Sequence, residues 1–132
     1  MSTLPTIDAL IAELTAGIAL LQELHTLAQT QSLFLDSGDL AGLSNVVEAK
    51  EKLVNRLHES KSSFSQSLSA AEFEKLETPE VRSLKERAVY LLQRIAEVEA
   101  RNRSRLQELR TDAIEQSQKL QESRKLNETY GG

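Results

Sequence analysis

Two histidines are the residues best suited to bind a metal ion in this chain, and neither has suitable neighbours. Helical proteins that hold a pair of iron ions use a Glu three residues before a His on each of two helices. Gln22 takes that place before His25. Asn55 takes it before His58, and neither side-chain amide is a good ligand for iron. Because the chain contains no cysteine, a structural zinc site is also hard to assemble. We therefore expect no metal site, with His25 at the edge of a core and His58 at the surface.

The remaining reactive groups do not form a catalytic pattern. The sequence has no glycine-rich phosphate loop, no nucleophile elbow and no thiol. Its many glutamates have lysine or arginine residues nearby, as on the solvated face of a helix. We therefore predict a protein that is not an enzyme and that binds no cofactor.

The densest group of like charges is the stretch RNRSRLQELR, residues 101–110, with four arginines against one glutamate. A nucleic-acid site would add interleaved aromatic side chains, and this stretch has none and is flanked by acidic residues. The whole chain has a formal net charge of -4, which argues against a nucleic-acid partner. The arginines suit a solvated helix face or the rim of a groove that binds protein.

The composition indicates that long helices position these residues. The chain has 132 residues, of which 22 are Leu, five are Gly and two are Pro, and it has no Trp. The most apolar run, LTAGIALLQ, is far shorter than the ~20 residues of a membrane span. The first residues lack the basic start of a signal peptide. We expect a cytoplasmic protein without stable membrane insertion.

Residues 1–35 carry two adjacent apolar stripes at helical spacing, so this helix should contact two neighbours. The first stripe is Ile7, Ile11, Leu14, Ile18, Leu21, His25, Ala28, Ser32 and Leu35, and the second is Leu20, Leu24, Leu27, Gln31 and Phe34. The stretch DSGD, residues 36–39, ends this helix at Gly38 and caps the next one with Asp39. Such a short turn makes the two helices antiparallel. The stripe of the second helix is Leu40, Leu43, Val47, Lys50, Val54, Leu57, Lys61 and Phe64.

Thr78, Pro79 and Glu80 form a strong start signal for a third helix, which should run to about Leu126. Its stripe is Val81, Leu84, Ala88, Leu91, Ile95, Val98, Asn102, Leu106, Leu109 and Ala113. Asn102 is a polar residue on an apolar seam, a position that usually fixes helix register. Ion pairs are expected between Glu97 and Arg101, Glu99 and Arg103, and Glu115 and Lys119. A capping box at Ser69 and Glu72 predicts a short helix near residues 70–76.

The three predicted helices differ in length. At 1.5 Å per residue they span roughly 45, 40 and 70 Å. We predict an all-α, antiparallel up-down-up bundle of three long helices in a single helical domain. Residues 1–107 form the bundle, and residues 108–132 project from it. Because an isolated helix of some 20 residues is marginal in water, the projecting part should fold back, form a homodimer or dock on a helix of another protein.

Two stretches carry a resemblance to a known family. They are SGDLAGLSNVVEAKEKLVNRL, residues 37–57, and LLQRIAEVEARNRSRLQELRTDAIEQSQKLQ, residues 91–121. With the tail TYGG, they resemble the FlgN family of flagellar export chaperones over nearly the whole chain. The resemblance implies a cytosolic chaperone that binds the terminal helices of the hook-associated (hook-filament junction) proteins. Such a chaperone prevents premature assembly and delivers its cargo to the type III export gate.

The resemblance also implies which residues bind the cargo, because the family uses the C-terminal part of its last helix. Here that part holds Leu106, Leu109, Ala113, Ile114, Leu120 and Leu126. Tyr130 is the one aromatic residue in the tail, and we expect it to contact the export machinery. The same pattern would suit a generic coiled-coil adaptor or another type III secretion chaperone, which is the alternative.

Overall fold

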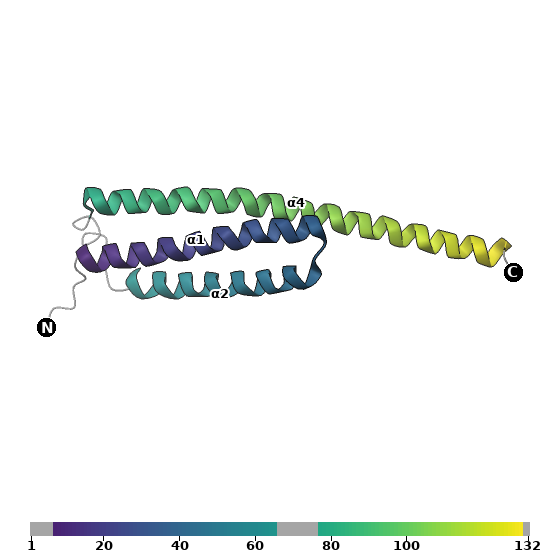
Figure 1. Ribbon diagram of the computed structural model, residues 1–132, viewed down its shortest axis with the longest axis horizontal. Coiled ribbons are helices and arrows are strands. Elements are labelled where there is room, and N and C mark those ends of the chain that lie inside the picture. Colours follow the sequence, from purple (N-terminus) through teal and green to yellow (C-terminus); the bar gives the residue numbers. More distant parts are fainter. Residues whose placement is uncertain (1–6, 66–76, 131–132) are drawn as a thin grey trace.

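The computed structural model describes residues 7–65 and 77–130, and the side chains of residues 60–65 are outside the description. The described part is all-α and holds three helices, α1 (Ile7–Ser37), α2 (Leu40–Ser65) and α4 (Pro79–Tyr130). Figure 1 shows α1 and α4 running in the same direction and α2 running in the opposite one. The predicted up-down-up bundle is therefore confirmed. The short helix predicted near residues 70–76 lies outside the described residues.

The turn between α1 and α2 forms as its residues predict. Gly38 has a φ of 73°, a left-handed conformation that glycine adopts without steric cost. The amide of Asp39 donates to the carbonyl oxygen of Phe34 at 3.1 Å, which closes the end of α1. The Oδ1 atom of Asp39 then accepts a hydrogen bond from the amide of Gly42 at 2.9 Å and caps α2. These contacts make α1 and α2 antiparallel neighbours.

The start of α4 also follows its predicted signal. The amide of Val81 donates to Oγ1 of Thr78 at 3.2 Å, so Thr78 caps the helix. Pro79 is the first helical residue, where its missing amide hydrogen has no cost. Glu80 lies in the first turn, next to the positive end of the helix dipole.

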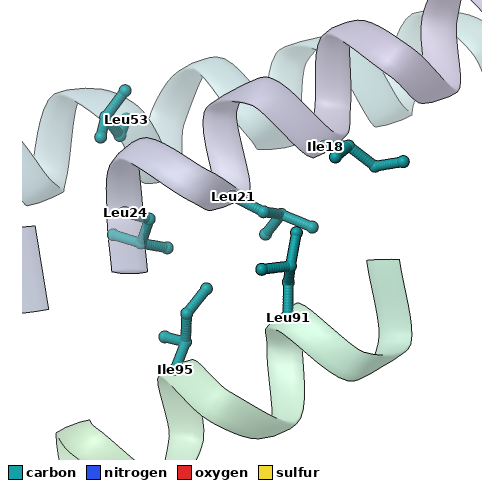
Figure 2. Packing of buried hydrophobic residues seen from close by; sticks show 6 residues of the cluster. All are labelled: Ile18, Leu21, Leu24, Leu53, Leu91 and Ile95. Carbon is teal, nitrogen blue, oxygen red and sulfur yellow. The ribbon is translucent and has the colours of Figure 1, made fainter. Parts of the chain in front are cut away.

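Helix α1 is the inner helix, as its two stripes predict. It contacts both α2 and α4, whereas the described parts of α2 and α4 make no backbone contact with each other. Figure 1 shows α1 lying between them. Figure 2 shows six residues of the core cluster, to which all three helices contribute. These residues are Ile18, Leu21 and Leu24 of α1, Leu53 of α2, and Leu91 and Ile95 of α4.

The buried face of α2 differs from the predicted stripe. Val46 and Leu53 are the buried residues, whereas Val47 and Val54 are 42% and 38% exposed and Leu40 is 78% exposed. The prediction was wrong because each buried residue has an apolar neighbour beside it in the chain, so two registers look alike. Because α1 is the only described helix whose backbone contacts that of α2, one narrow seam of α2 is buried, and Val47 and Val54 lie at its edge.

Helix α4 is much longer than its partner helices. It has 52 residues, against 31 in α1 and 26 in α2. Asn102 is its last buried residue, Leu106 and Leu109 are half-buried, and every residue from Arg110 to Tyr130 is exposed. Residues 110–130 are called the overhang below, and Figure 1 shows them extending past the α1–α2 turn. None of the described helices is long and apolar enough to cross a membrane.

Candidate protein-docking site

A buried polar layer holds α4 against α1 just before the overhang. Asn102 is only 3% exposed. Its Nδ2 atom donates to the carbonyl oxygen of Ala28 at 3.0 Å and to Oε1 of Gln31 at 3.5 Å. Its Oδ1 atom accepts a hydrogen bond from Oγ of Ser32 at 2.5 Å. Because both ends of the amide have partners on α1, sliding α4 along α1 would leave buried polar groups unpaired. This geometry supports the predicted role of Asn102 in fixing register.

Lys50 joins this layer from α2. Its Nζ atom donates to Oε1 of Gln31 at 2.6 Å and forms an ion pair with Glu99 of α4. The two charged side chains are 16% and 29% exposed, so water screens them less than it screens a surface pair. Among the described residues, this ion pair is the only polar link between α2 and α4. Sequence reasoning missed it, although a lysine on an apolar stripe is a signal for such a contact.

The overhang and the turn of α4 just before it carry the predicted cargo-binding residues, and they do not all share one face. A helix turns by about 100° per residue. On this basis Leu106, Leu109, Ala113 and Leu120 fall within an arc of about 60°, in line with the face of α4 that packs on α1. They are called the docking stripe below. Ile114 lies about 110° from the centre of that arc, and Leu126 lies about 130° away on the other side.

Exposure differs along the docking stripe. Leu106 and Leu109 are half-buried beside the end of α1, whereas Ala113 and Leu120 are exposed. Tyr130 is 83% exposed and is the last described residue of α4. Its position at the tip separates it from the bundle by the full length of the overhang.

A groove opens where α4 leaves α1. It has a volume of about 590 Å³ and is lined by Ser32, Leu35 and Asp36 of α1 and by Arg101, Arg105 and Glu108 of α4. Arg105 pairs with one lining residue on each helix, with Nε lying 3.6 Å from Oδ1 of Asp36 and Nη1 lying 3.2 Å from Oε2 of Glu108. None of the docking-stripe residues lines the groove, which lies on the side of α4 that carries Arg101, Arg105 and Glu108. Sequence reasoning did not predict it, because it depends on where α1 ends beside α4.

The three ion pairs predicted along α4 do not form. Glu97 instead pairs with Arg94, with Oε2 and Nη1 3.4 Å apart, and Glu99 pairs with Lys50. No ion pair joins Glu115 and Lys119 within the described residues. Within that same part of the chain, Arg101 and Arg103 consequently have no carboxylate partner.

The histidines lie where the sequence suggests. His25 is half-buried, with its Nε2 atom buried and without a hydrogen-bond partner among the described residues, and His58 is exposed. The described residues contain no group of three or more His, Cys, Asp or Glu side chains that could hold a metal ion. The exposed apolar stripe beyond the end of α1 is the feature of the described residues that suits contact with another helix.

Comparison with known proteins identifies the family. The family model described as FlgN protein matches residues 1–132, the whole chain. Neither the curated proteins nor the solved structures include a match to this chain. A whole-chain match agrees with the helix lengths and with the two stretches that carry the resemblance. The chain therefore belongs to the FlgN family of flagellar export chaperones.

Proposed function

We propose that this protein is a cytoplasmic chaperone that binds the terminal helices of hook-associated proteins along the docking stripe. In this proposal residues 108–132 are the projecting helix and tail of the single helical domain, and they bind the cargo together with Leu106. The observation that carries it is the continuity of one face of α4, which packs on α1 up to Asn102 and then runs on without a partner in the described chain. A cargo helix would occupy the place beside α4 that α1 leaves at Ser37.

Burial of apolar surface would drive the binding. An apolar area of about 600 Å² removed from water contributes on the order of 15 kcal/mol before the costs of ordering and association. The half-buried Leu106 and Leu109 already sit beside the end of α1, so they are partly ordered before cargo arrives. Covering the apolar face of a cargo helix would also keep that helix from assembling with other subunits before export.

Tyr130 is proposed to contact the flagellar export apparatus. It lies at the far end of the overhang and is 83% exposed. A phenol ring at that place has an apolar body and a polar hydroxyl, a combination that is common in protein interfaces. It would remain accessible while cargo covers the docking stripe, because it is displaced from that stripe both along and around the helix.

A capture experiment tests the proposal. The full chain, immobilised and exposed to extract from its source cell, should retain one or two abundant secreted proteins with helical ends, identified as hook-associated proteins by mass spectrometry. A chain truncated at residue 107 should fold and lose them. Recovery of nucleic acid, or of nothing, would contradict the proposal.

The same truncated chain tests the alternative of a generic adaptor that forms a homodimer. That alternative predicts that the truncation abolishes self-association, which sedimentation measures directly. The chaperone proposal predicts the loss of cargo capture instead.

A further inference from the structure

The two apolar stripes of α1 hold α2 and α4 at an angle that leaves one side of the bundle open. Leu20 and Leu27 of one stripe directly precede Leu21 and Ala28 of the other, so the stripes point about 100° apart. Three helices in mutual contact would require about 60°, whereas a four-helix bundle requires about 90°. The described parts of α2 and α4 accordingly make no backbone contact with each other. The three helices thus take three corners of a four-helix arrangement, and the vacant corner between α2 and α4 is called the open side below.

Apolar side chains line the open side on both helices. The ion pair of Lys50 with Glu99 shows which side of each helix is turned toward the other. On α2, Val47 and Val54 lie within about 60° of Lys50 and are 42% and 38% exposed. On α4, Leu92 lies about 20° from Glu99 and is 51% exposed. A shallow hollow of about 490 Å³ on α2 is lined by Val47, Lys50, Glu51, Val54 and Asn55.

The floor of the open side has room for side chains from a fourth helix. Gly17 lies on α1 between the two stripes, about 60° from Leu20 and 40° from Leu21. A methyl group at Gly17 would have no neighbour within 4 Å outside its own turn of helix. Because protein interiors are close-packed, this space marks a place that an additional helix would cover.

Helix α2 of a second copy has the features that this place requires. Val47 and Val54 are seven residues apart, and valine at heptad spacing favours a pair of parallel helices. In such a pair each valine meets its own counterpart across a twofold axis. Lys50 of one copy then lies on the same side of the seam as Glu51 of the other, at nearly the same level. Glu51 and Arg103, which also faces the open side, have no ion-pair partner among the described residues, so the pairing supplies complementary charge.

We infer that this protein forms a parallel homodimer in which α2 of each copy occupies the open side of the other. The exchange is reciprocal, so the assembly closes at two copies. Three helix contacts form, one between the two α2 helices and one between each α2 and the other copy's α4. Each can extend over about 39 Å, the length of the 26-residue α2. An interface of standard size, about 1,200–2,000 Å² in total, needs roughly 400–700 Å² from each of the three contacts.

The dimer leaves both docking stripes available. Because the twofold axis runs along the bundle, both overhangs point in the same direction. Helix α2 begins at the turn beside the end of α1, so neither copy of α2 reaches the overhang of the other. The inference therefore goes beyond the proposed function and gives the chaperone two cargo sites at one end.

Analytical ultracentrifugation of the full chain tests the inference. At the highest concentration at which it stays soluble, the chain should sediment at twice the 14.7 kDa mass of one copy. The chain truncated at residue 107 keeps α2 and the open side, so it should remain a dimer. A monomeric full chain, or a dimer that the truncation abolishes, would overturn the inference.

Two matched double variants locate the interface. Val47→Asp with Leu92→Asp places charge in the open side and should convert the dimer to a monomer. The control, Leu33→Asp with Tyr90→Asp, changes side chains that are 68% and 58% exposed on the outer faces of α1 and α4, and it should remain a dimer. Circular dichroism verifies that both variants are helical. If the first variant does not fold, Glu51→Lys replaces it and should weaken the dimer about tenfold, because it sets like charges against each other across the seam.

Disulfide crosslinking tests the parallel arrangement. The chain has no cysteine, so Val47→Cys introduces a single thiol. Across the twofold axis two such residues have Cα atoms within the roughly 7 Å that a disulfide can span, and mild oxidation should join the copies. Leu33→Cys, on the outer face of α1, is the control and should stay uncrosslinked. Equal crosslinking of both variants, or of neither, would contradict the arrangement, as would equal sedimentation of the two double variants. Cargo capture by a monomeric chain would sink this inference alone and leave the proposed function standing.

Discussion

Asn102 has an environment that accounts for a polar residue on an apolar seam. Its amide is matched by Ala28, Gln31 and Ser32, all on one turn of α1. A leucine at this place would bury more apolar surface, but it would fit equally well one heptad away. The hydrogen bonds therefore define where α4 sits along α1, and in consequence how much of α4 extends past the turn.

Replacement of Asn102 should test this role. Asn102→Ala removes the amide and leaves its former partners on α1 buried without it, which should lower the free energy of unfolding by about 1–3 kcal/mol. Asn127→Ala is the matched control, because Asn127 is exposed on the overhang. It should change stability by less than about 0.5 kcal/mol. Urea unfolding followed by circular dichroism measures both, and equal effects would show that the layer adds no stability.

Lys50 allows a similar comparison with a surface lysine. Lys50→Met keeps the apolar stem but leaves Glu99 and Gln31 without the ammonium, so we expect a loss of about 1–2 kcal/mol. Lys52→Met breaks the exposed pair with Glu48, in which Nζ and Oε1 are 3.6 Å apart, and should have an effect below about 0.5 kcal/mol. Thermal unfolding of the two variants measures the two losses of stability. A smaller effect at Lys50 than at Lys52 would contradict the described layer.

At the scale of the element, the arrangement of the helices follows from how many apolar faces each one has. Helix α1 has two faces and takes the inner place, with α2 on one and α4 on the other. Helix α2 uses one narrow seam on α1, so part of its apolar stripe remains at the edge. Helix α4 continues the face that packs on α1 past the end of its partner.

Substitutions at two adjacent residues of α2 should show which of them lies on the buried seam. Leu53→Ala removes a side chain from the central cluster and should cost about 2–4 kcal/mol. Val54→Ala alters a side chain that is 38% exposed and should cost less than about 1 kcal/mol. Chemical denaturation of the two variants gives the comparison. A larger effect at Val54 would restore the stripe expected from the sequence.

The predictability of these elements depends on whether a signal is local. The Gly38 turn and the Thr78 cap are encoded in a few neighbouring residues, and both are confirmed. The seam of α2 was not predictable, because Val46 and Val47 offer two registers that only contact with α1 separates. The partner of Glu99 was missed for a related reason. Lys50 is remote in the sequence, and only the fold brings it to Glu99 in place of the expected local partner.

At the scale of the whole molecule, the decisive property is the unequal length of the helices. A helix of 52 residues beside one of 31 leaves part of its surface uncovered whenever both start near the same end. The sequence predicted this overhang from counting residues and from the absence of Gly and Pro between Pro79 and Gly131. It did not separate the residues on the docking stripe from those beside it, because that requires knowing which face of α4 packs on α1.

Substitutions should distinguish the docking stripe from the other apolar residues of the overhang by their effect on cargo capture. The double change Ala113→Asp and Leu120→Asp places charge on the stripe and should abolish capture of hook-associated proteins. The double change Ile114→Asp and Leu126→Asp adds the same charge to residues that lie away from it. Because α1 and the docked helix would cover only one face of α4, the second variant should retain capture to within a few-fold.

Stability measurements make this comparison interpretable. All four residues are exposed, so both double variants should melt within about 2–4 °C of the unaltered chain. A large drop for the stripe variant alone would mean that Ala113 and Leu120 pack within the chain, in which case the loss of capture would reflect unfolding. If the two variants instead lose capture equally while staying folded, cargo surrounds the overhang and does not select one face. Only a loss confined to the stripe variant fits a helix that docks in line with α1, because that geometry makes one continuous face of α4 serve first the bundle and then the cargo.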